Sequence, residues 1–193
     1  MTRGASIART APTRRRFVLG AAAGGALVAA WPGRNAIAVP QAPVLSGTDF
    51  QLEVGPLPVN FTGRPRIATA INARVPGPVL RWREGDTVTL AVTNRLDDAT
   101  TIHWHGVRTP SPMDGVPGLS QRGINPGESF VYRFPVRQSG TYWYHAHSPA
   151  EQTGVYAAIV IEPKGGYAQA FDRDYTVVLS DWSDESQIGR AHV

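Results

Sequence analysis

Four of the five histidines in this chain occur in two pairs, each with one residue between the two rings. The first pair is His103-Trp104-His105 and the second is His145-Ala146-His147. Imidazole nitrogens are good ligands for zinc, copper, iron and nickel. A single pair would be weak evidence, but two pairs within aromatic, strand-like sequence are much stronger. They predict a metal site, and the residue types alone leave the metal open.

The spacing within each pair has a direct consequence if the pair lies in a β-strand. Side chains alternate between the two faces of a strand, so His103 and His105 project from one face, about 6.6 Å apart. His145 and His147 are expected to do the same. This separation is wide for two ligands of one ion. It suits two neighbouring ions that each take one imidazole from each pair, with Trp104 free to pack in the core on the other face.

The surrounding sequence indicates an all-β domain that positions these pairs. Short apolar or alternating runs are separated by Gly, Pro and Asn at regular spacing, which is typical of a β-sandwich or barrel. The segment from Arg108 to Gly123 is rich in Pro, Gly and Ser, and loops of this length are usually functional or disordered. Strands are predicted near Phe50–Val54, Ile67–Ile71, Pro78–Arg83, Thr87–Asn94, Thr101–Val107, Ser129–Pro135, Thr141–His147 and Val155–Ile161.

Residues 1–38 are interpreted as an export signal. Arg14-Arg15-Arg16-Phe17 resembles the twin-arginine pattern, an apolar, Gly-rich run of about 14 residues follows, and Ala36-Ile37-Ala38 supplies a small-x-small cleavage pattern. A membrane anchor is the alternative, but a spanning helix needs about 20 apolar residues. We therefore expect export by the twin-arginine machinery to the periplasm, with no stable membrane anchor.

The charge of the chain argues against a nucleic-acid partner. The net charge is +4, but residues 1–38 contain six arginines and no acid, and the rest has 13 basic and 15 acidic residues. The basic excess therefore belongs to the signal. The chain has no Cys, which excludes disulfides and any thiolate-bound metal within it.

Both histidine pairs lie in motifs that resemble the first two copper motifs of multicopper oxidases. These motifs are His103-Trp104-His105-Gly106 and Thr141-Tyr142-Trp143-Tyr144-His145-Ala146-His147. Further segments resemble the copper-resistance protein A branch of that family. They are Pro58–Gly63, Leu80–Asp86, Met113–Gly118, Glu151–Tyr156 and Leu179–Trp182.

This resemblance implies a cupredoxin-like Greek-key β-sandwich and copper as the cofactor. In the family, a trinuclear copper cluster forms between the first and last domains. By motif, His103 would bind the type 2 copper, His105 and His145 would share one type 3 copper, and His147 would bind the other. The remaining cluster ligands and the Cys of the type 1 site would come from a C-terminal domain, so this chain would hold half the cluster ligands and no type 1 site.

Asp114 is the candidate catalytic residue. It follows the first copper motif in the long loop, where related oxidases place an acid near the cluster, and a carboxylate there could orient a ligand or pass protons. The alternative is a turn-forming Asp before Gly115. Three aromatic residues, Trp82, Trp143 and Tyr144, are expected to pack in the core.

The C-terminal part is expected to leave this domain. Residues 39–163 are assigned to the N-terminal cupredoxin domain, and 164–187 to a linker and the start of a second, truncated one, with its first strand near Tyr175–Trp182. The last six residues, 188–193, are interpreted as a non-native tail because their codons resemble a sequencing adapter. This tail contains His192.

The expected parent is a periplasmic multicopper oxidase that couples oxidation of a substrate, cuprous ion or a phenol, to reduction of dioxygen to water in copper resistance. Two alternatives remain: a laccase acting mainly on phenols, and a copper-binding cupredoxin module without turnover. This chain alone is expected to be inactive, because it lacks half of the cluster and the entry site for electrons.

Overall fold

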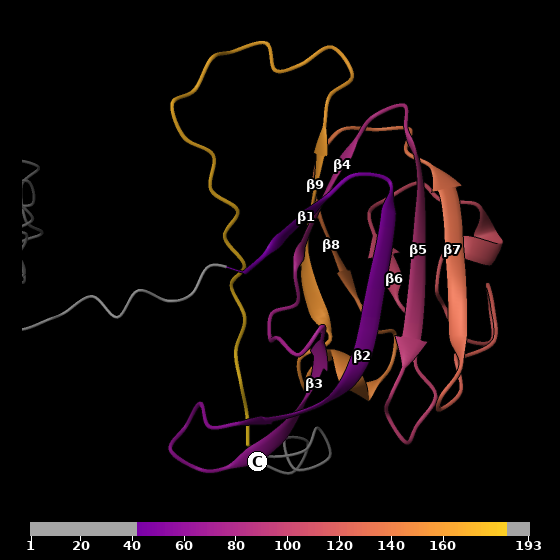
Figure 1. The fold of residues 1–193 in the computed structure, drawn as a ribbon, viewed down its shortest axis with the longest axis vertical. Helices are drawn as coiled ribbons and strands as arrows, with labels where there is room; N and C mark the ends of the chain where they lie inside the picture. Colours follow the sequence, from indigo (N-terminus) through magenta and orange to yellow (C-terminus); the bar gives the residue numbers. More distant parts are fainter. Residues whose placement is uncertain (1–41, 185–193) are drawn as a thin grey trace, which may run out of the picture. The chain divides into compact units, whose positions relative to one another are not determined.

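The computed structural model describes residues 42–184, which form two packed β-sheets (Figure 1). One sheet has five strands, in the order β1 (Val44–Ser46), β4 (Val79–Arg83), β9 (Tyr156–Glu162), β8 (Gly140–His145) and β6 (His103–His105). The other has four, in the order β3 (Arg66–Ile71), β2 (Asp49–Val59), β5 (Thr87–Asn94) and β7 (Ser129–Pro135). Two single-turn 3₁₀ helices, η1 (Ser111–Met113) and η2 (Pro149–Glu151), interrupt the loops. The predicted all-β sandwich is confirmed.

The alternating sequence of β5 shows why these residues form a two-layered structure. Val88, Leu90 and Val92 are fully buried, whereas the residues that alternate with them (Thr87, Thr89, Ala91 and Thr93) are partly or fully exposed. Strand β5 pairs in parallel with β2 and antiparallel with β7. One apolar face of each strand can therefore be removed from water while the other stays solvated.

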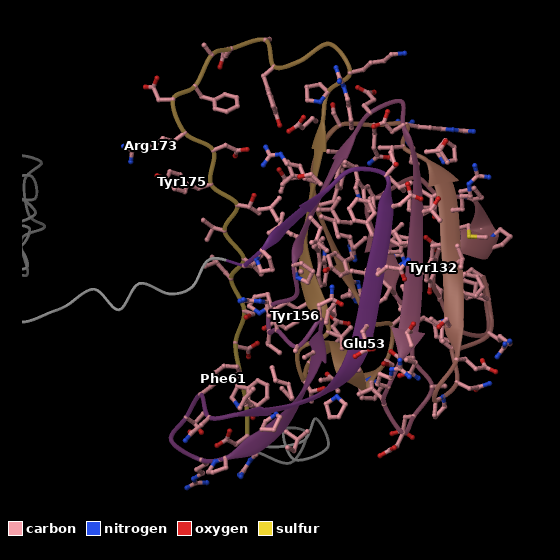
Figure 2. All side chains as sticks on the ribbon, viewed as in Figure 1. Glu53, Phe61, Tyr132, Tyr156, Arg173 and Tyr175 are labelled. Atoms are coloured by element: carbon pink, nitrogen blue, oxygen red, sulfur yellow. The ribbon has the colours of Figure 1, made fainter. Side chains whose placement is uncertain are left out.

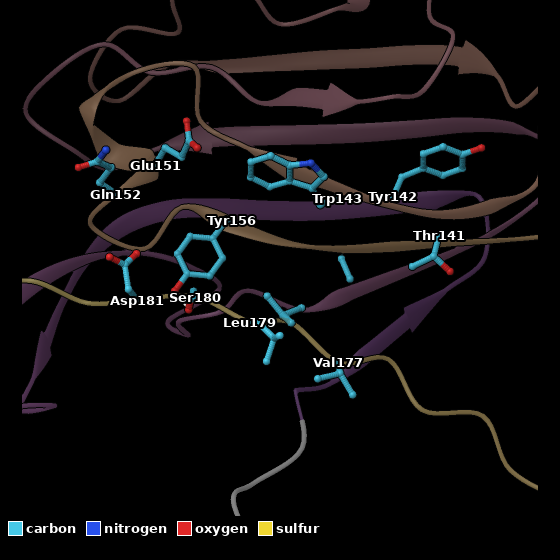
Figure 3. A pocket seen from close by; sticks show the side chains of 12 residues that line it. Thr141, Tyr142, Trp143, Glu151, Gln152, Tyr156, Val177, Leu179, Ser180 and Asp181 are labelled. Carbon is cyan, nitrogen blue, oxygen red and sulfur yellow. Dashed lines mark hydrogen bonds between the residues drawn. The ribbon is translucent and has the colours of Figure 1, made fainter. Parts of the chain in front are cut away.

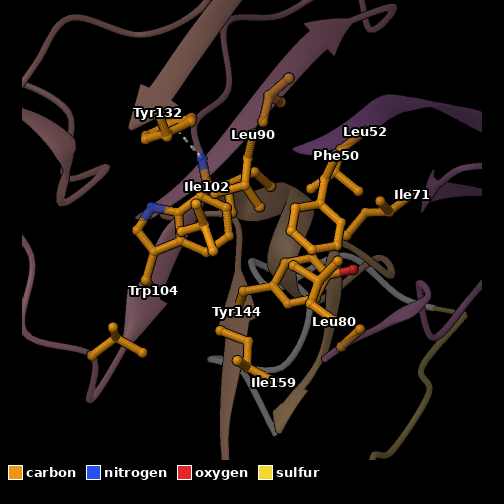
Figure 4. Packing of buried hydrophobic residues seen from close by; sticks show 14 of the residues in the cluster. Phe50, Leu52, Ile71, Leu80, Leu90, Ile102, Trp104, Tyr132, Tyr144 and Ile159 are labelled. Carbon is orange, nitrogen blue, oxygen red and sulfur yellow. Dashed lines mark hydrogen bonds between the residues drawn. The ribbon is translucent and has the colours of Figure 1, made fainter. Parts of the chain in front are cut away.

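Large aromatic side chains fill the space between the sheets (Figure 4). Trp104 contacts Trp82, Tyr132 and Tyr144, with ring centroids 5.2 to 6.0 Å apart. The hydroxyl of Tyr144 donates to the carbonyl of Pro78 at 2.7 Å. Each buried tyrosine thus combines a large apolar contact area with a satisfied polar end.

Tyr132 ties the core to the first histidine pair. Its hydroxyl accepts hydrogen bonds from the backbone N–H of Ile102 at 3.1 Å and from the side-chain amide of Gln121 at 2.9 Å. Burial raises the pKa of Tyr132 to about 12, so the hydroxyl stays protonated at neutral pH. The bond to Ile102 fixes the backbone one residue before His103.

Strand β6 lies at the edge of the five-stranded sheet and pairs antiparallel with β8. In this register His103 lies opposite His145, and His105 lies opposite Trp143. The intervening Trp104 is buried, as predicted. Because side chains alternate along a strand, His103 and His105 lie on the outer face of the sheet, opposite to Trp104.

The strands that carry the histidines are shorter than predicted. Strand β6 covers three residues rather than Thr101–Val107, and Gly106 follows it at a φ of 80°. Strand β8 ends at His145, and the next residue turns to donate its N–H to the carbonyl of Val155 at 2.9 Å. The expectation that one strand holds both His145 and His147 is therefore wrong. Strand β1 was not predicted at all.

Residues 163–184 follow β9 without forming a strand, so the strand expected at Tyr175–Trp182 is absent from this structure. The segment is anchored by side chains, some labelled in Figure 2. The hydroxyls of Tyr156 and Ser180 lie 2.7 Å apart, and the rings of Phe61 and Trp182 meet edge to face at 4.9 Å. The assignment to a second domain remains a prediction. The signal at 1–38 and the tail at 188–193 lie outside the described residues.

Candidate metal centre

Three of the four predicted ligands form a compact group on the outer face of the sheet. The ligand atoms of His103, His105 and His145 all lie within 4.8 Å of one another. Nδ1 of His105 lies 3.2 Å from Nε2 of His145. Two of the three residues come from the first pair and one from the second, and they meet because β6 and β8 are adjacent strands.

His147 lies beside this group but outside its tightest part. Its ring centroid is 5.7 Å from that of His103 and 6.1 Å from that of His145, and its side chain is exposed. The structure therefore brings all four rings to one side of the molecule, even though His147 follows the end of the strand. The assignment of each ring to a particular copper ion remains a prediction.

The hydrogen bonds of two rings determine which nitrogen is free to bind a metal. Nδ1 of His103 lies 2.7 Å from the carbonyl oxygen of Asp114, and Nδ1 of His145 lies 2.9 Å from that of Ala146. A carbonyl oxygen only accepts, so Nδ1 of each ring carries the proton. The lone pair of each ring is then on Nε2, and for His145 this is the atom that faces His105.

Burial also favours the metal-binding form of His145. Only 5% of this residue is exposed, and this desolvation is the main cause that lowers the pKa of His145 below its ordinary value. The hydrogen bond to the Ala146 carbonyl and the charge of Glu151 oppose this lowering of the pKa, and the rings of His103 and His105 add smaller lowering effects. A neutral imidazole binds a metal ion, whereas an imidazolium cannot.

The distance between the two facing nitrogens fits a shared ion. Two nitrogens bonded to one metal at about 2 Å in tetrahedral geometry are about 3.3 Å apart. The observed separation between His105 and His145 is 3.2 Å. The donor set contains only imidazoles, which suit copper as well as zinc, iron or nickel. The residues therefore fit a copper ion.

Asp114 is placed against His103 by the loop that follows β6. Its Oδ1 atom lies 3.5 Å from Nδ1 of His103 and accepts a hydrogen bond from the Thr109 hydroxyl at 3.2 Å. Its own N–H donates to the carbonyl of Ser111 at 3.1 Å and closes the turn of η1. Asp114 is thus both a turn residue and a neighbour of a predicted ligand. Its catalytic role remains a prediction.

Trp143 was expected in the core, and this expectation is wrong. The residue is 37% exposed. It shares the outer face of β8 with His145 because the two are two positions apart. Its ring stacks on His145, with centroids 4.0 Å apart, and on His105 at 4.9 Å. Trp82 and Tyr144 are core residues as predicted.

Glu151 is a neighbour of the site that the sequence reasoning missed. Its Oε2 atom lies 3.0 Å from Nδ1 of His145. The available signal was an acid four residues after His147, inside a segment noted for its resemblance to the copper-resistance branch. Sequence separation alone gave no reason to direct this carboxylate back to the first histidine of the pair.

A cavity of about 450 Å³ lies next to the histidines, between the outer sheet face and residues 177–181 (Figure 3). Trp143, Glu151 and Tyr156 form its sheet side, and Leu179 and Ser180 lie opposite. Trp143 and Glu151 also contact His145, so the cavity adjoins the histidine group.

The chain belongs to the multicopper oxidase family, whose family model matches residues 53–166. The structure agrees with that membership. It superposes on the crystal structure of a multi-copper oxidase from Pseudomonas thermotolerans with a TM-score of 0.58 and 37% sequence identity, over 64% of this chain and 31% of the other. The cupredoxin-like fold implied by the sequence motifs is confirmed.

Within the family, the chain is similar to copper resistance protein A. It is 55% identical to that protein from Pseudomonas syringae pv. tomato over 181 residues, which are 91% of this chain and 30% of the relative. It is 50% identical to that of Escherichia coli over 179 residues, 90% of this chain and 30% of the relative. The chain thus spans just under a third of the length of these relatives.

Proposed function

We propose that this chain is the N-terminal part of an oxidase that couples oxidation of a reducing substrate to reduction of dioxygen to water. His103, His105, His145 and His147 would supply half of the ligands of its trinuclear copper cluster. Following the family motifs, His103 would belong to the type 2 site, His105 and His145 to one type 3 ion, and His147 to the other. The observation that carries the proposal is the 3.2 Å approach of His105 Nδ1 to His145 Nε2.

Copper bound at these residues would supply the one-electron redox chemistry that joins substrate oxidation to the four-electron reduction of dioxygen. The chain's own contribution is to hold the ligand nitrogens in place. Backbone carbonyls keep the proton on Nδ1 of His103 and of His145. Each Nε2 is then available without a prior loss of a proton, and the rings need little reorganisation when an ion binds.

Asp114 would serve as the acid near the cluster. Its backbone carbonyl orients His103, while its partly exposed carboxylate lies 3.5 Å from the same ring and is in reach of solvent. Reduction of dioxygen to water consumes protons, and a carboxylate between solvent and a ligand ring is suited to deliver them.

The reducing substrate is proposed to be cuprous ion or a phenol, in a role in copper resistance. The similarity to copper resistance protein A favours this role. A laccase that acts mainly on phenols is the alternative within the family. The blue type 1 site, where electrons enter, needs a Cys thiolate, and this chain has no Cys. That site and the other cluster ligands would therefore come from further domains.

The protein is proposed to work in the periplasm after export by the twin-arginine machinery. The support is the Arg14-Arg15-Arg16-Phe17 pattern, the apolar run and the Ala36-Ile37-Ala38 motif, all in residues 1–38. Within residues 42–184 the structure contains no helix long and apolar enough to cross a membrane.

Oxygen consumption by the full-length gene product tests the proposed function. His105→Ala should abolish oxygen reduction with cuprous ion or a phenol, because it removes a ligand of the shared ion, while the blue absorption of the distant type 1 site persists. Arg122→Ala is the matched control, since this exposed arginine pairs with Glu128. Its oxygen consumption should equal that of the unaltered protein.

The 193-residue chain alone should show no intense blue absorption and consume no oxygen. Oxygen consumption by the purified chain would contradict the half-cluster proposal. A full-length protein that stays colourless and inert after copper loading would instead favour a copper-binding module without turnover.

A further inference from the structure

We propose that Glu151 is a positioning residue of the copper site, which acts with the carbonyl of Ala146 to hold His145 with its proton on Nδ1 and its Nε2 directed at the ion. The inference rests on the proposed copper-binding role of His145. Its basis is the 3.0 Å contact between Oε2 of Glu151 and Nδ1 of His145, on the side of the ring opposite the nitrogen that faces His105.

The contact differs from those of the other glutamates in ion pairs. Glu53, Glu128 and Glu162 each pair with an arginine at 2.7 to 3.0 Å. Glu151 instead contacts an imidazole whose side chain is only 7% exposed. Surface pairs with arginine contribute little to stability. A carboxylate directed at the protonated nitrogen of a metal-ligating histidine fixes the ring and raises the basicity of its other nitrogen.

A short, firmly anchored turn brings Glu151 to this position. Its N–H donates to the carbonyl of Ser148 at 3.0 Å, and the Ser148 hydroxyl accepts from the N–H of Ala150 at 3.3 Å. The Thr69 hydroxyl of β3 donates to the carbonyl of Ala150 at 2.8 Å. The turn is thus tied both to itself and to a strand of the other sheet.

Gly154 closes the turn against the same strand. Its φ is 130°, and a Cβ there would lie 2.3 Å from the carbonyl oxygen of Thr69. The N–H of Gly154 donates to the carbonyl of Glu151 at 3.2 Å. The N–H and the carbonyl of Glu151 are therefore both hydrogen-bonded within the turn, which fixes the backbone that carries the carboxylate.

The neighbours of His145 cover one face of its ring and both of its nitrogens. Trp143 stacks on one face of its ring at 4.0 Å, and Ala146 and Glu151 occupy the Nδ1 edge. Nε2 points to His105. Glu151 adds a negative charge to the one edge that must keep its proton when an ion binds at the other.

Copper affinity of the full 193-residue chain tests the inference, with copper alone as the probe in a competition titration against a chromophoric chelator. Glu151→Ala should weaken binding by about 10- to 100-fold, the usual effect of removing a partner of a ligating histidine. Glu151→Gln keeps an acceptor oxygen without the charge, so its affinity should be intermediate. Glu162→Ala is the matched control, because it removes a glutamate that pairs with Arg81, and it should leave the affinity unchanged.

Nitrogen-15 NMR of the metal-free chain provides a readout that is independent of copper. The His145 ring should show the Nδ1-protonated tautomer in the unaltered chain, and Glu151→Ala should shift the Nδ1 resonance and populate the other tautomer. Backbone spectra that otherwise coincide would show that the variant is folded.

The outcomes separate this inference from the proposed function. If His145→Ala abolishes copper binding while Glu151→Ala changes neither the affinity nor the ring resonances, the positioning role is wrong and the copper site stands. If His145→Ala leaves copper binding unchanged, the proposed site fails, and the ring resonances of Glu151→Ala still decide whether this carboxylate holds His145.

Discussion

The two sides of the histidine group keep the proton on the same ring nitrogen, Nδ1, with different supports. On the β6 side, Nδ1 of His103 meets the backbone carbonyl of Asp114 at 2.7 Å, and the carboxylate of that residue is 3.5 Å away. On the β8 side, Nδ1 of His145 meets the carbonyl of Ala146 at 2.9 Å and the carboxylate of Glu151 at 3.0 Å. The acid is thus in closer contact on the β8 side.

The difference shows two ways to orient a ligand. A long loop returns its backbone to His103, so the orientation depends on the path of the loop and less on the Asp114 side chain. A short turn brings a carboxylate to His145 beside the carbonyl of Ala146, so the orientation there depends on the Glu151 side chain as well as on the backbone. A glycine at positive φ packs against a backbone oxygen in both, Gly115 against Ile102 and Gly154 against Thr69.

The largest effect is expected from Gly115→Ala. Its φ is 77°, and an added Cβ would lie 1.9 Å from the carbonyl oxygen of Ile102, so the loop and the carbonyl of Asp114 must move. We expect the free energy of unfolding to fall by about 3 kcal/mol or more, and copper affinity to fall with it. Denaturant unfolding and a copper titration of the chain measure these changes.

Gly118→Ala is the matched control for this prediction. Its φ is 75°, but its Cβ would have no atom within 4 Å. It should therefore show only the cost of a left-handed backbone, about 1–2 kcal/mol. Equal losses of stability for the two variants would contradict the idea that the loop path, fixed at Gly115, orients His103.

A smaller effect on copper affinity is expected from Asp114→Asn. The backbone carbonyl that holds His103 is retained, so copper affinity should change less than for Glu151→Ala. Oxygen reduction by the full-length protein should still fall by about 100-fold or more, because an amide cannot pass protons. An affinity loss as large as that of Glu151→Ala would remove the distinction between the two sides.

The strands with clear alternation could be predicted from the sequence. Thr87–Asn94 and Ser129–Pro135 form strands with the predicted bounds, because each buries one apolar face. Strand β1 has three residues and pairs in parallel with β4, too short to give a periodic signal. The predicted strand at Tyr175–Trp182 has a suitable pattern, but in this structure it pairs with no neighbouring strand.

The parts of the candidate site that follow from residue spacing could be predicted from the sequence. The two H-x-H pairs were found because alternation places each pair on one face of a strand. The exposure of Trp143 follows from the same alternation, but its size and aromatic character suggested the core. The contact of Glu151 with His145 depends on how a turn folds back onto its own strand, which no local pattern reports.

The central claim is that His105 and His145 bind one ion through Nδ1 and Nε2, respectively. Anomalous X-ray diffraction at the copper edge from crystals of the copper-loaded full-length protein tests it most directly. The account predicts a copper peak within about 2 Å of both nitrogens, with Nδ1 of His145 facing away toward Glu151. A copper peak bonded to only one of these two rings, or to Nδ1 of His145, would contradict it.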